Sequence, residues 1–217
     1  MRRRLQHILG VVVSVSSLSV CLLASPCGSL RPLAAAEAPQ HYRVVPERST
    51  ASYRIREQLA GINFPSDGVG TTQAVTGTIA LDDQGHVRLS DSRMTIDLRT
   101  LRSDSDRRDN YVRRKTLETE RYPTVVFVPT AVRGLPRPLP HSGTVPLTLL
   151  GDLTVRDVTR LVTWDATATV EGDEVRVQAH TTVRFADFGL TIPRVASVLS
   201  VEDGIRLEVD LRLQRRA

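Results

Sequence analysis

The chain has 217 residues, with 29 Lys or Arg against 24 Asp or Glu, and a formal net charge of +5. Its first 36 residues hold four arginines and no acid, so the remaining 181 residues carry a net charge of only +1. A nucleic-acid-binding chain would keep a basic excess there, so no nucleic-acid partner is expected. Both cysteines, Cys21 and Cys27, also lie in this first part, which leaves the rest without a disulfide.

The N-terminus has the pattern of a secretory signal peptide. Arg2–Arg4 form a positive head, Ile8–Ala24 is an apolar run, and the small residues Ala34–Ala36 follow. We therefore predict a signal peptide over residues 1–36, cleavage between Ala36 and Glu37, and a periplasmic or secreted product. We expect that product not to span a membrane.

Two other interpretations of this segment are less favoured. A membrane anchor needs a longer apolar run than this one, which four serines interrupt. A lipoprotein would attach its lipid at Cys21 or Cys27. The residues that precede them are Val20 and Pro26, whereas lipid attachment normally wants a small residue.

Alternation of apolar and polar residues with period two predicts β-strands in four segments after the signal. Such alternation is typical of an antiparallel sheet with one apolar and one solvated face. The segments are Ala51–Glu57, Ser92–Thr100, Glu174–Phe185 and Ile205–Leu213.

Four less regular strands are predicted between these, separated by turn residues rich in Gly, Pro and Asp. They are Gln73–Leu81, Thr124–Val132, Val145–Val155 and Leu161–Val170. Eight strands are enough to close an antiparallel sheet around an interior for side chains or one small ligand. We therefore predict an all-β, eight-stranded antiparallel barrel over residues 37–217, with a two-sheet sandwich as the competing arrangement.

One charged segment interrupts the strands and predicts a short helix. Ser105 or Asp106 can cap its start, and Arg113–Lys115 near its end suit the helix dipole. Tyr122 precedes a proline, so the helix should end before it. Such a helix can cover one mouth of the barrel, or it can be a solvated crossover without contact to the interior. The local sequence does not separate these two.

The sequence offers no catalytic or metal-binding constellation. The histidines that follow the signal, His41, His86, His141 and His180, lack ligand spacing, so we predict no metal site. Residues 67–73 contain two glycines but no strand–helix pattern, so we predict a loop there rather than a phosphate cradle. No serine or threonine sits in a nucleophile elbow. We therefore predict that the chain is not an enzyme, although catalysis on this scaffold is an alternative.

The inner faces of the predicted strands define a candidate apolar interior. This interior is either an ordinary packed core or a tube for a long apolar ligand. Its predicted ligand-binding residues are Tyr53, Ile55, Met94, Ile96, Phe127, Leu149, Trp164, Val183, Phe185, Leu207 and Val209.

Three segments, in this order, resemble motifs of the YceI-like family. The first has Arg-Asp, a short helix and then Tyr-Pro before an apolar strand; the second is a Gly-x-Leu-Thr strand; the third is Asp-Phe-Gly. The matching residues are Arg108, Asp109, Tyr122, Pro123, Val125 and Phe127; Gly151, Leu153, Thr154 and Val155; and Asp187, Phe188 and Gly189.

The resemblance implies an exported, lipocalin-like eight-stranded barrel with its helix beside the mouth. It also implies non-covalent binding of a polyisoprenoid lipid or an isoprenoid quinone, with no covalent cofactor. Arg108, Asp109 and Tyr122 are then candidates for contact with the ligand's headgroup. The chain differs from the family pattern at Phe185, where an arginine is usual, and in a long first hairpin over residues 58–72.

The function expected from the sequence is therefore that of an exported carrier or sequestering protein for an isoprenoid-type lipid. Its oligomeric state is open, with a homodimer as one option. The alternatives are a structural or interaction barrel with a packed core and no ligand, and a lipid- or stress-related enzyme.

Overall fold

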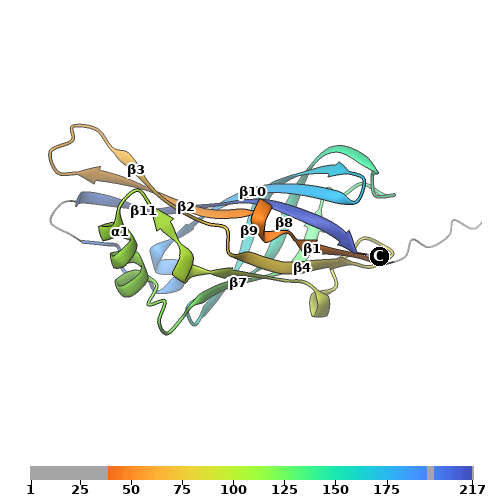
Figure 1. Cartoon of the computed structure of the whole chain (residues 1–217), viewed down its shortest axis with the longest axis horizontal. Coiled ribbons are helices and arrows are strands. Elements are labelled where there is room, and N and C mark those ends of the chain that lie inside the picture. The colour runs from red at the N-terminus through yellow and green to blue at the C-terminus, as the bar shows by residue number, and fades with distance from the viewer. Residues whose placement is uncertain (1–38, 195–197, 217) are drawn as a thin grey trace, which may run out of the picture. The chain divides into compact units, whose positions relative to one another are not determined.

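A computed structural model describes residues 39–194 and 198–216, and most of these residues lie in β-strands (Figure 1). The predicted signal peptide lies outside the described residues. The strands are β1 (Gln40–Val44), β2 (Thr50–Leu59), β3 (Ser66–Thr72), β4 (Val75–Leu81), β5 (Arg93–Asp97), β6 (Arg102–Ser103), β7 (Thr124–Arg133), β8 (Ser142–Val155), β9 (Val158–Glu171), β10 (Glu174–Arg184) and β11 (Val198–Arg216).

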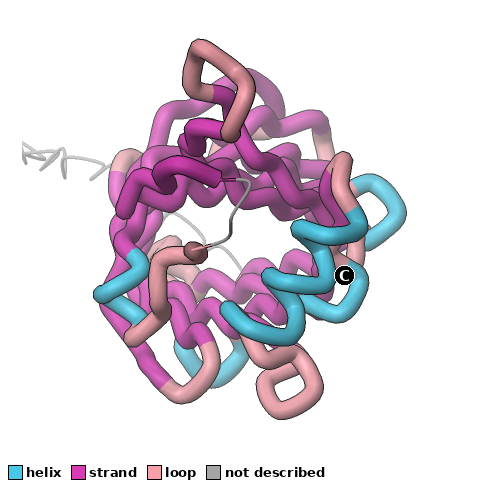
Figure 2. Tube along the Cα trace, turned by 90° about the vertical axis from the view of Figure 1, so that its left-hand side faces the viewer, coloured by secondary structure: helices cyan, strands magenta, loops and turns pink. Residues whose placement is uncertain are grey.

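These strands close into a barrel. The order β1-β4-β5-β7-β8-β9-β10-β11 returns to its start because β1 pairs with β11 as well as with β4, and each of these pairings is antiparallel. The view from the end that carries the helix shows this ring (Figure 2). The eight-stranded barrel predicted from the sequence is confirmed, and the two-sheet sandwich is wrong.

The eleven strands form eight walls because three walls are each divided into two strands. β1 and β2 both pair with β11, one after the other along its length. In the next wall, β3 pairs with β2 and β4 pairs with β1. In the wall after that, β6 pairs with β3 and β5 pairs with β4. The three divided walls are therefore β1/β2, β3/β4 and β5/β6.

The prediction of a loop at residues 67–73 is wrong, because Ser66–Thr72 forms strand β3. Glycine has a low strand propensity, which explains the error. Here the glycines make room for larger neighbours. A Cβ on Gly70 would lie 2.3 Å from Cε1 of Tyr53, and one on Gly68 would lie 3.1 Å from Nε of Arg108.

The helical segment follows β6. The Ser105 hydroxyl accepts a hydrogen bond from the Arg108 amide at 3.3 Å and caps α1 (Asp106–Tyr111), which continues into the π-helical turn η4 (Val112–Thr116). The helix ends before Tyr122, as predicted, and β7 begins just after Pro123. None of the helices within residues 39–194 and 198–216 is long and apolar enough to cross a membrane.

Within the part of the chain that the structure describes, four short 3₁₀ helices lie at bends and strand ends. The last of them begins at Phe185, although the sequence pattern predicts this residue as the end of a strand. Its side chain still turns inward and is only 1% exposed. The four helices are η1 (Pro46–Arg48), η2 (Leu89–Asp91), η3 (Leu98–Thr100) and η5 (Phe185–Phe188).

Replacing Gly70 should test the packing of β3 under Tyr53. We expect Gly70→Ala to lower the free energy of unfolding by about 1 to 3 kcal/mol, because the new methyl group overlaps the Tyr53 ring. Gly204→Ala is the matched control, since a Cβ there meets only Thr182 Cγ2 at 3.6 Å. Urea unfolding measures both.

A double-mutant cycle makes this test specific. If the tyrosine ring causes the strain, Gly70→Ala should cost less stability in a Tyr53→Leu background than in the wild type. Equal costs in both backgrounds would contradict the close packing of Gly70 and Tyr53.

Candidate ligand-binding cavity

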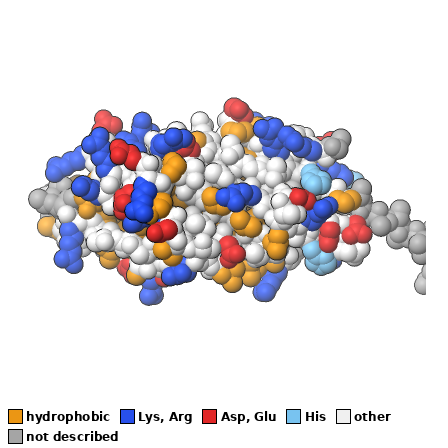
Figure 3. Space-filling view, turned by 90° about the horizontal axis from the view of Figure 1, so that it is seen from below, with side chains coloured by type: hydrophobic (Ala, Val, Ile, Leu, Met, Phe, Trp, Pro, Cys, Tyr) orange, Lys and Arg blue, Asp and Glu red, His pale blue; other side chains and the backbone are white. Residues whose placement is uncertain are grey.

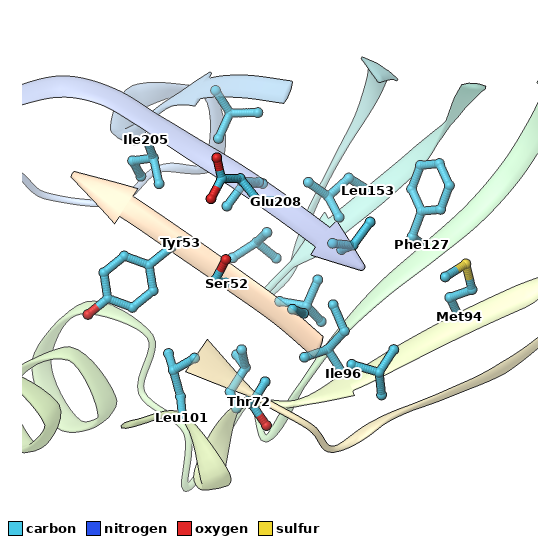
Figure 4. Close-up of a pocket in the computed structure, with 18 of the residues that line it drawn as sticks. Ser52, Tyr53, Thr72, Met94, Ile96, Leu101, Phe127, Leu153, Ile205 and Glu208 are labelled. Atoms are coloured by element: carbon cyan, nitrogen blue, oxygen red, sulfur yellow. The ribbon is translucent and has the colours of Figure 1, made fainter. Parts of the chain in front are cut away.

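The barrel encloses an apolar cavity of about 180 Å³ to which all eight walls contribute side chains. Figure 4 shows part of its lining, with Tyr53 on the side of the helix and Phe127 and Met94 farther along. All of the residues predicted for the interior line it, so the structure brings them together: Tyr53, Ile55, Met94, Ile96, Phe127, Leu149, Trp164, Val183, Phe185, Leu207 and Val209. Binding of a ligand to them remains a prediction.

The lining is apolar because alternate residues of each strand face inward. Phe127 and Trp164 pack edge to face, with ring centroids 5.8 Å apart and planes at 70°. Ser52 and Glu208 also border the cavity, but their neighbours Tyr53 and Leu207 take the inward positions. Glu208 forms an ion pair with Arg206 at 2.7 Å. On the face seen in Figure 3, basic and acidic side chains are interspersed.

The helical segment contributes lining that the sequence analysis missed. Val112, Thr116 and Leu117 all border the cavity, which rules out a solvated crossover and makes this segment a cover for one end of the barrel. The spacing of Val112 and Thr116, four residues apart on one helical face, was the available signal. Further lining residues absent from the predicted set include Leu98, Leu101, Phe188, Leu190 and Pro193.

The three headgroup candidates do not line the cavity, and they belong to two separate clusters. Arg108 donates to Oε1 of Glu57 at 2.5 Å and also binds Asp104. Asp109 is only 4% exposed, and its Oδ1 accepts from the amide and the hydroxyl of Ser103 at 2.8 and 2.6 Å. These contacts attach α1 to the barrel through Glu57 of β2 and Ser103 of β6.

Tyr122 belongs to the other cluster, at the turn between β8 and β9. Its hydroxyl donates to Oδ2 of Asp157 at 3.3 Å. The guanidinium of Arg156 lies 5.4 Å from the centre of its ring and pairs with Glu118 at 2.8 Å. This cluster joins the chain ahead of β7 to a hairpin, so Tyr122 has a structural role here.

Glu57 is a buried acid that the sequence analysis overlooked. It is 9% exposed and follows Tyr53 and Ile55 in the inward register of β2. The same alternation that predicted the lining therefore indicated a carboxylate on the inner face of this wall. Burying it is expensive unless a cation is paired with it, and Arg108 supplies that cation.

The hydroxyl of Tyr53 lies within the field of this cluster. Burial raises the pKa of Tyr53 to about 12, with Arg108 acting to lower it and Asp109, Glu57 and Asp104 acting to raise it. Tyr53 is therefore a neutral phenol at physiological pH, and the carboxylates around it outnumber the cations.

No metal cluster accompanies the cavity. Across residues 39–194 and 198–216, no group of three or more His, Cys, Asp or Glu side chains is placed to hold a metal ion.

Comparison with known proteins decides the family. The model of the YceI-like domain matches residues 42–213, which is most of the chain. The chain belongs to the YceI-like family. Two UPF0312 proteins of Pseudomonas putida are 32% identical to it over 115 residues, which is 49% of this chain. The matched region spans only about half (56%) of the length of these relatives.

Solved structures agree with the barrel fold. A polyisoprenoid-binding domain from Saccharophagus degradans aligns with a TM-score of 0.64 at 14% identity, covering 81% of this chain and 98% of that domain. BcnA of Burkholderia cenocepacia aligns with a TM-score of 0.58 at 19% identity, and the alignment covers 78% of this chain and 98% of BcnA. The YceI protein of Campylobacter jejuni aligns with a TM-score of 0.53 at 15% identity, and the alignment covers 68% of this chain and 85% of that protein. At these identities the likeness extends to the fold alone.

The raised pKa of Tyr53 should give a stability change at alkaline pH. An unfolded tyrosine loses its proton near pH 10, whereas folded Tyr53 keeps it to about pH 12. Between these pH values the unfolded state binds fewer protons than the folded state. The free energy of unfolding therefore falls as the pH rises, by about 2 to 3 kcal/mol in all. Below pH 10 this group adds no pH dependence.

Urea unfolding between pH 9 and 12 measures this effect. Tyr53→Phe should lose less stability over that range than the wild type, and its absorbance titration at 295 nm should lack the latest step. Parallel stability curves for the two proteins would count against a buried, neutral phenol.

Proposed function

We propose that this YceI-like chain is an exported protein that binds an isoprenoid-type lipid non-covalently inside its barrel and carries or sequesters it. The observation that carries the proposal is the apolar cavity lined by all eight walls and covered by η4 at one end. The polyisoprenoid-binding domain from S. degradans, which shares this fold, supports a polyprenyl chain as the ligand. The signal pattern of residues 1–36 supports a periplasmic or secreted location.

Burial of an apolar chain supplies enough free energy for this function. Each buried CH₂ contributes about 0.8 kcal/mol, and micromolar affinity requires about 8 kcal/mol. Two or three isoprene units therefore reach that affinity, even after some loss from ordering the chain.

The size of the cavity limits how a longer ligand fits. Its volume of about 180 Å³ is below the roughly 300 to 1,000 Å³ usual for ligand pockets. A ligand of many isoprene units would have to displace lining side chains or extend through the mouth. Met94 is the lining residue best suited to move, because its side chain is flexible.

The competing function is that of a structural or interaction barrel without a ligand. The small volume of the cavity favours this alternative. Organic extraction of protein purified from its native host, without detergent, separates the two. We expect mass spectrometry to find a stoichiometric polyprenyl or quinone species, and N-terminal sequencing to begin at Glu37. Protein that is free of lipid and also fails to bind added polyprenols would reject the carrier function.

Narrowing the cavity should weaken binding of the ligand. Ala179 lines the cavity from β10, so Ala179→Phe should weaken the affinity for geranylgeraniol by at least about tenfold, because the ring occupies the ligand's space. Gln178→Phe is the matched control, since it adds the same ring one residue earlier, at an exposed position of the same strand.

Circular dichroism should find both variants folded, with Ala179→Phe destabilised by about 1 to 3 kcal/mol. Equal affinities for the two folded variants would place the ligand outside the barrel.

A further inference from the structure

Three exposed apolar side chains gather at the tip of the hairpin between β2 and β3. Among the described residues, five large apolar side chains are exposed, and these three are Ile62 and Phe64 in the loop and Leu199 at the start of β11. Phe64 is 69% exposed and Leu199 is 68% exposed. Leu199 lies beside the hairpin because its neighbours in β11 pair with Gln58 and Leu59. Single exposed apolar residues are common, but a group of them marks a surface that contacts another body.

This apolar tip, formed by Ile62, Phe64 and Leu199, belongs to the end of the barrel that carries the helix. The hairpin projects past the ring of strands at the same end as α1 (Figure 1). Strand β2 contributes Tyr53 and Ile55 to the cavity lining and continues into the hairpin. A body that contacts the apolar tip would therefore lie next to the covered end of the cavity.

The loop is suited to an apolar environment. The segment Gln58–Ser66 contains no charged side chain, although 24% of the chain is charged. The Gln58 side-chain amide donates to the Leu59 carbonyl at 3.3 Å and also to the Ile62 carbonyl, and the Ile62 amide donates to the Leu59 carbonyl at 3.3 Å. Backbone groups that are bonded within the loop cost less free energy to remove from water.

The apolar tip is too small for a stable interface with another protein. Such an interface buries about 800 Å² per partner, from about 20 to 30 residues on each side. Here only residues 58–65 lie beyond the last pair of the hairpin, Glu57 with Ser66. A lipid bilayer needs no such area, because single aromatic and aliphatic side chains insert at the level of its headgroups.

The charges behind the apolar tip are nearly balanced. On the outer face of the hairpin, Arg54 and Arg56 both pair with Asp67 at 3.1 Å. Glu202 and Asp203 lie in the irregular stretch of β11 that faces β2. These charges neither attract a strongly charged protein nor repel lipid phosphates, so burial of the apolar side chains is left as the driving force.

We propose that the apolar tip docks the barrel onto a lipid bilayer, with the helix end of the barrel facing the membrane. Ile62, Phe64 and Leu199 insert among the headgroups, and the charged outer face of the hairpin stays in water. A lipid that moves between the membrane and the cavity would then cross less water. This inference goes beyond the proposed function, because docking requires no lipid inside the barrel.

Vesicle flotation measures the docking. Protein purified from its native host without detergent is mixed with vesicles made of equal parts of phosphatidylcholine and phosphatidylglycerol. We expect Phe64→Ser to weaken partitioning onto the vesicles by at least about tenfold, because the inserted ring is lost.

Leu89→Ser is the matched control and should partition as the wild type does. Leu89 is 57% exposed but lies in η2, whose preceding residue Arg88 bonds to Ala80 near the other end of the barrel. Circular dichroism should find both variants folded, since neither side chain is buried.

A tryptophan reporter shows whether the apolar tip itself inserts. Trp164 is the only tryptophan of the chain, so Phe64→Trp in a Trp164→Phe background reports the loop alone. Its emission should shift to the blue on vesicle binding and be quenched by brominated phosphatidylcholine. Leu89→Trp in the same background should show neither change.

Three results would overturn the docking: a wild type that does not bind vesicles, equal partitioning of Phe64→Ser and the wild type, or a Phe64→Trp reporter that stays in water on bound protein. A wild-type dimer in size-exclusion chromatography that Phe64→Ser makes monomeric, without vesicle binding, would also overturn it and assign the apolar tip to a second copy.

The docking and the proposed function fail separately. Binding of geranylgeraniol in solution, followed by the fluorescence of Trp164 in the cavity, should be the same for Phe64→Ser and the wild type. Intact geranylgeraniol binding without vesicle binding would overturn the docking alone. Vesicle binding through the apolar tip without geranylgeraniol binding would support the docking and count against the carrier function.

Discussion

Closure of the sheet through β1 is the constraint on which the remaining structure depends. β1 is only five residues long, yet it pairs with β4 on one side and β11 on the other. The wall bends directly after it, and the bend removes backbone partners from β11. Ser49 replaces one of them: its hydroxyl accepts from the Arg212 amide at 2.9 Å and donates to the Val45 carbonyl at 2.7 Å. A fully buried hydroxyl thus maintains the hydrogen bonding where the closing wall changes direction.

Because the ring closes, the inner faces share one interior, and the helical segment has to cover its end. Glu57 determines where the helical segment contacts the barrel. A carboxylate in the inward register of β2 needs a cation, and Arg108 of α1 provides it across 51 positions of sequence. The contact that positions the helix is also the contact that neutralises the guanidinium of Arg108, which acts on Tyr53. Covering the cavity and pairing the buried carboxylate therefore depend on the same two residues.

The sequence predicted the parts of this molecule that follow from local periodicity. Alternation found the inner residues of β2, β10 and β11, and the Ser105 cap with the Tyr122-Pro123 step bounded the helix. The sequence analysis failed at β3, because Gly70 packs under Tyr53 of the neighbouring strand. Local propensity carries no information about such a contact between two strands. The sequence also grouped Arg108 with Tyr122, which the folded chain assigns to separate clusters. Pairing over long separations cannot be obtained from spacing along the chain.

The two ends of the barrel have different roles. At the end away from the helix, Val44 of β1 and Leu213 of β11 lie opposite each other, are almost fully buried and belong to the packed core rather than to the cavity lining. Tyr53 and Thr116 border the hollow part at the helix end. The interior is thus solid in one part and hollow in the other, so a packed core and a ligand cavity are both present in one barrel. A lipid of the proposed kind would therefore have to occupy the hollow part near the helix, where the apolar walls replace water around its chain.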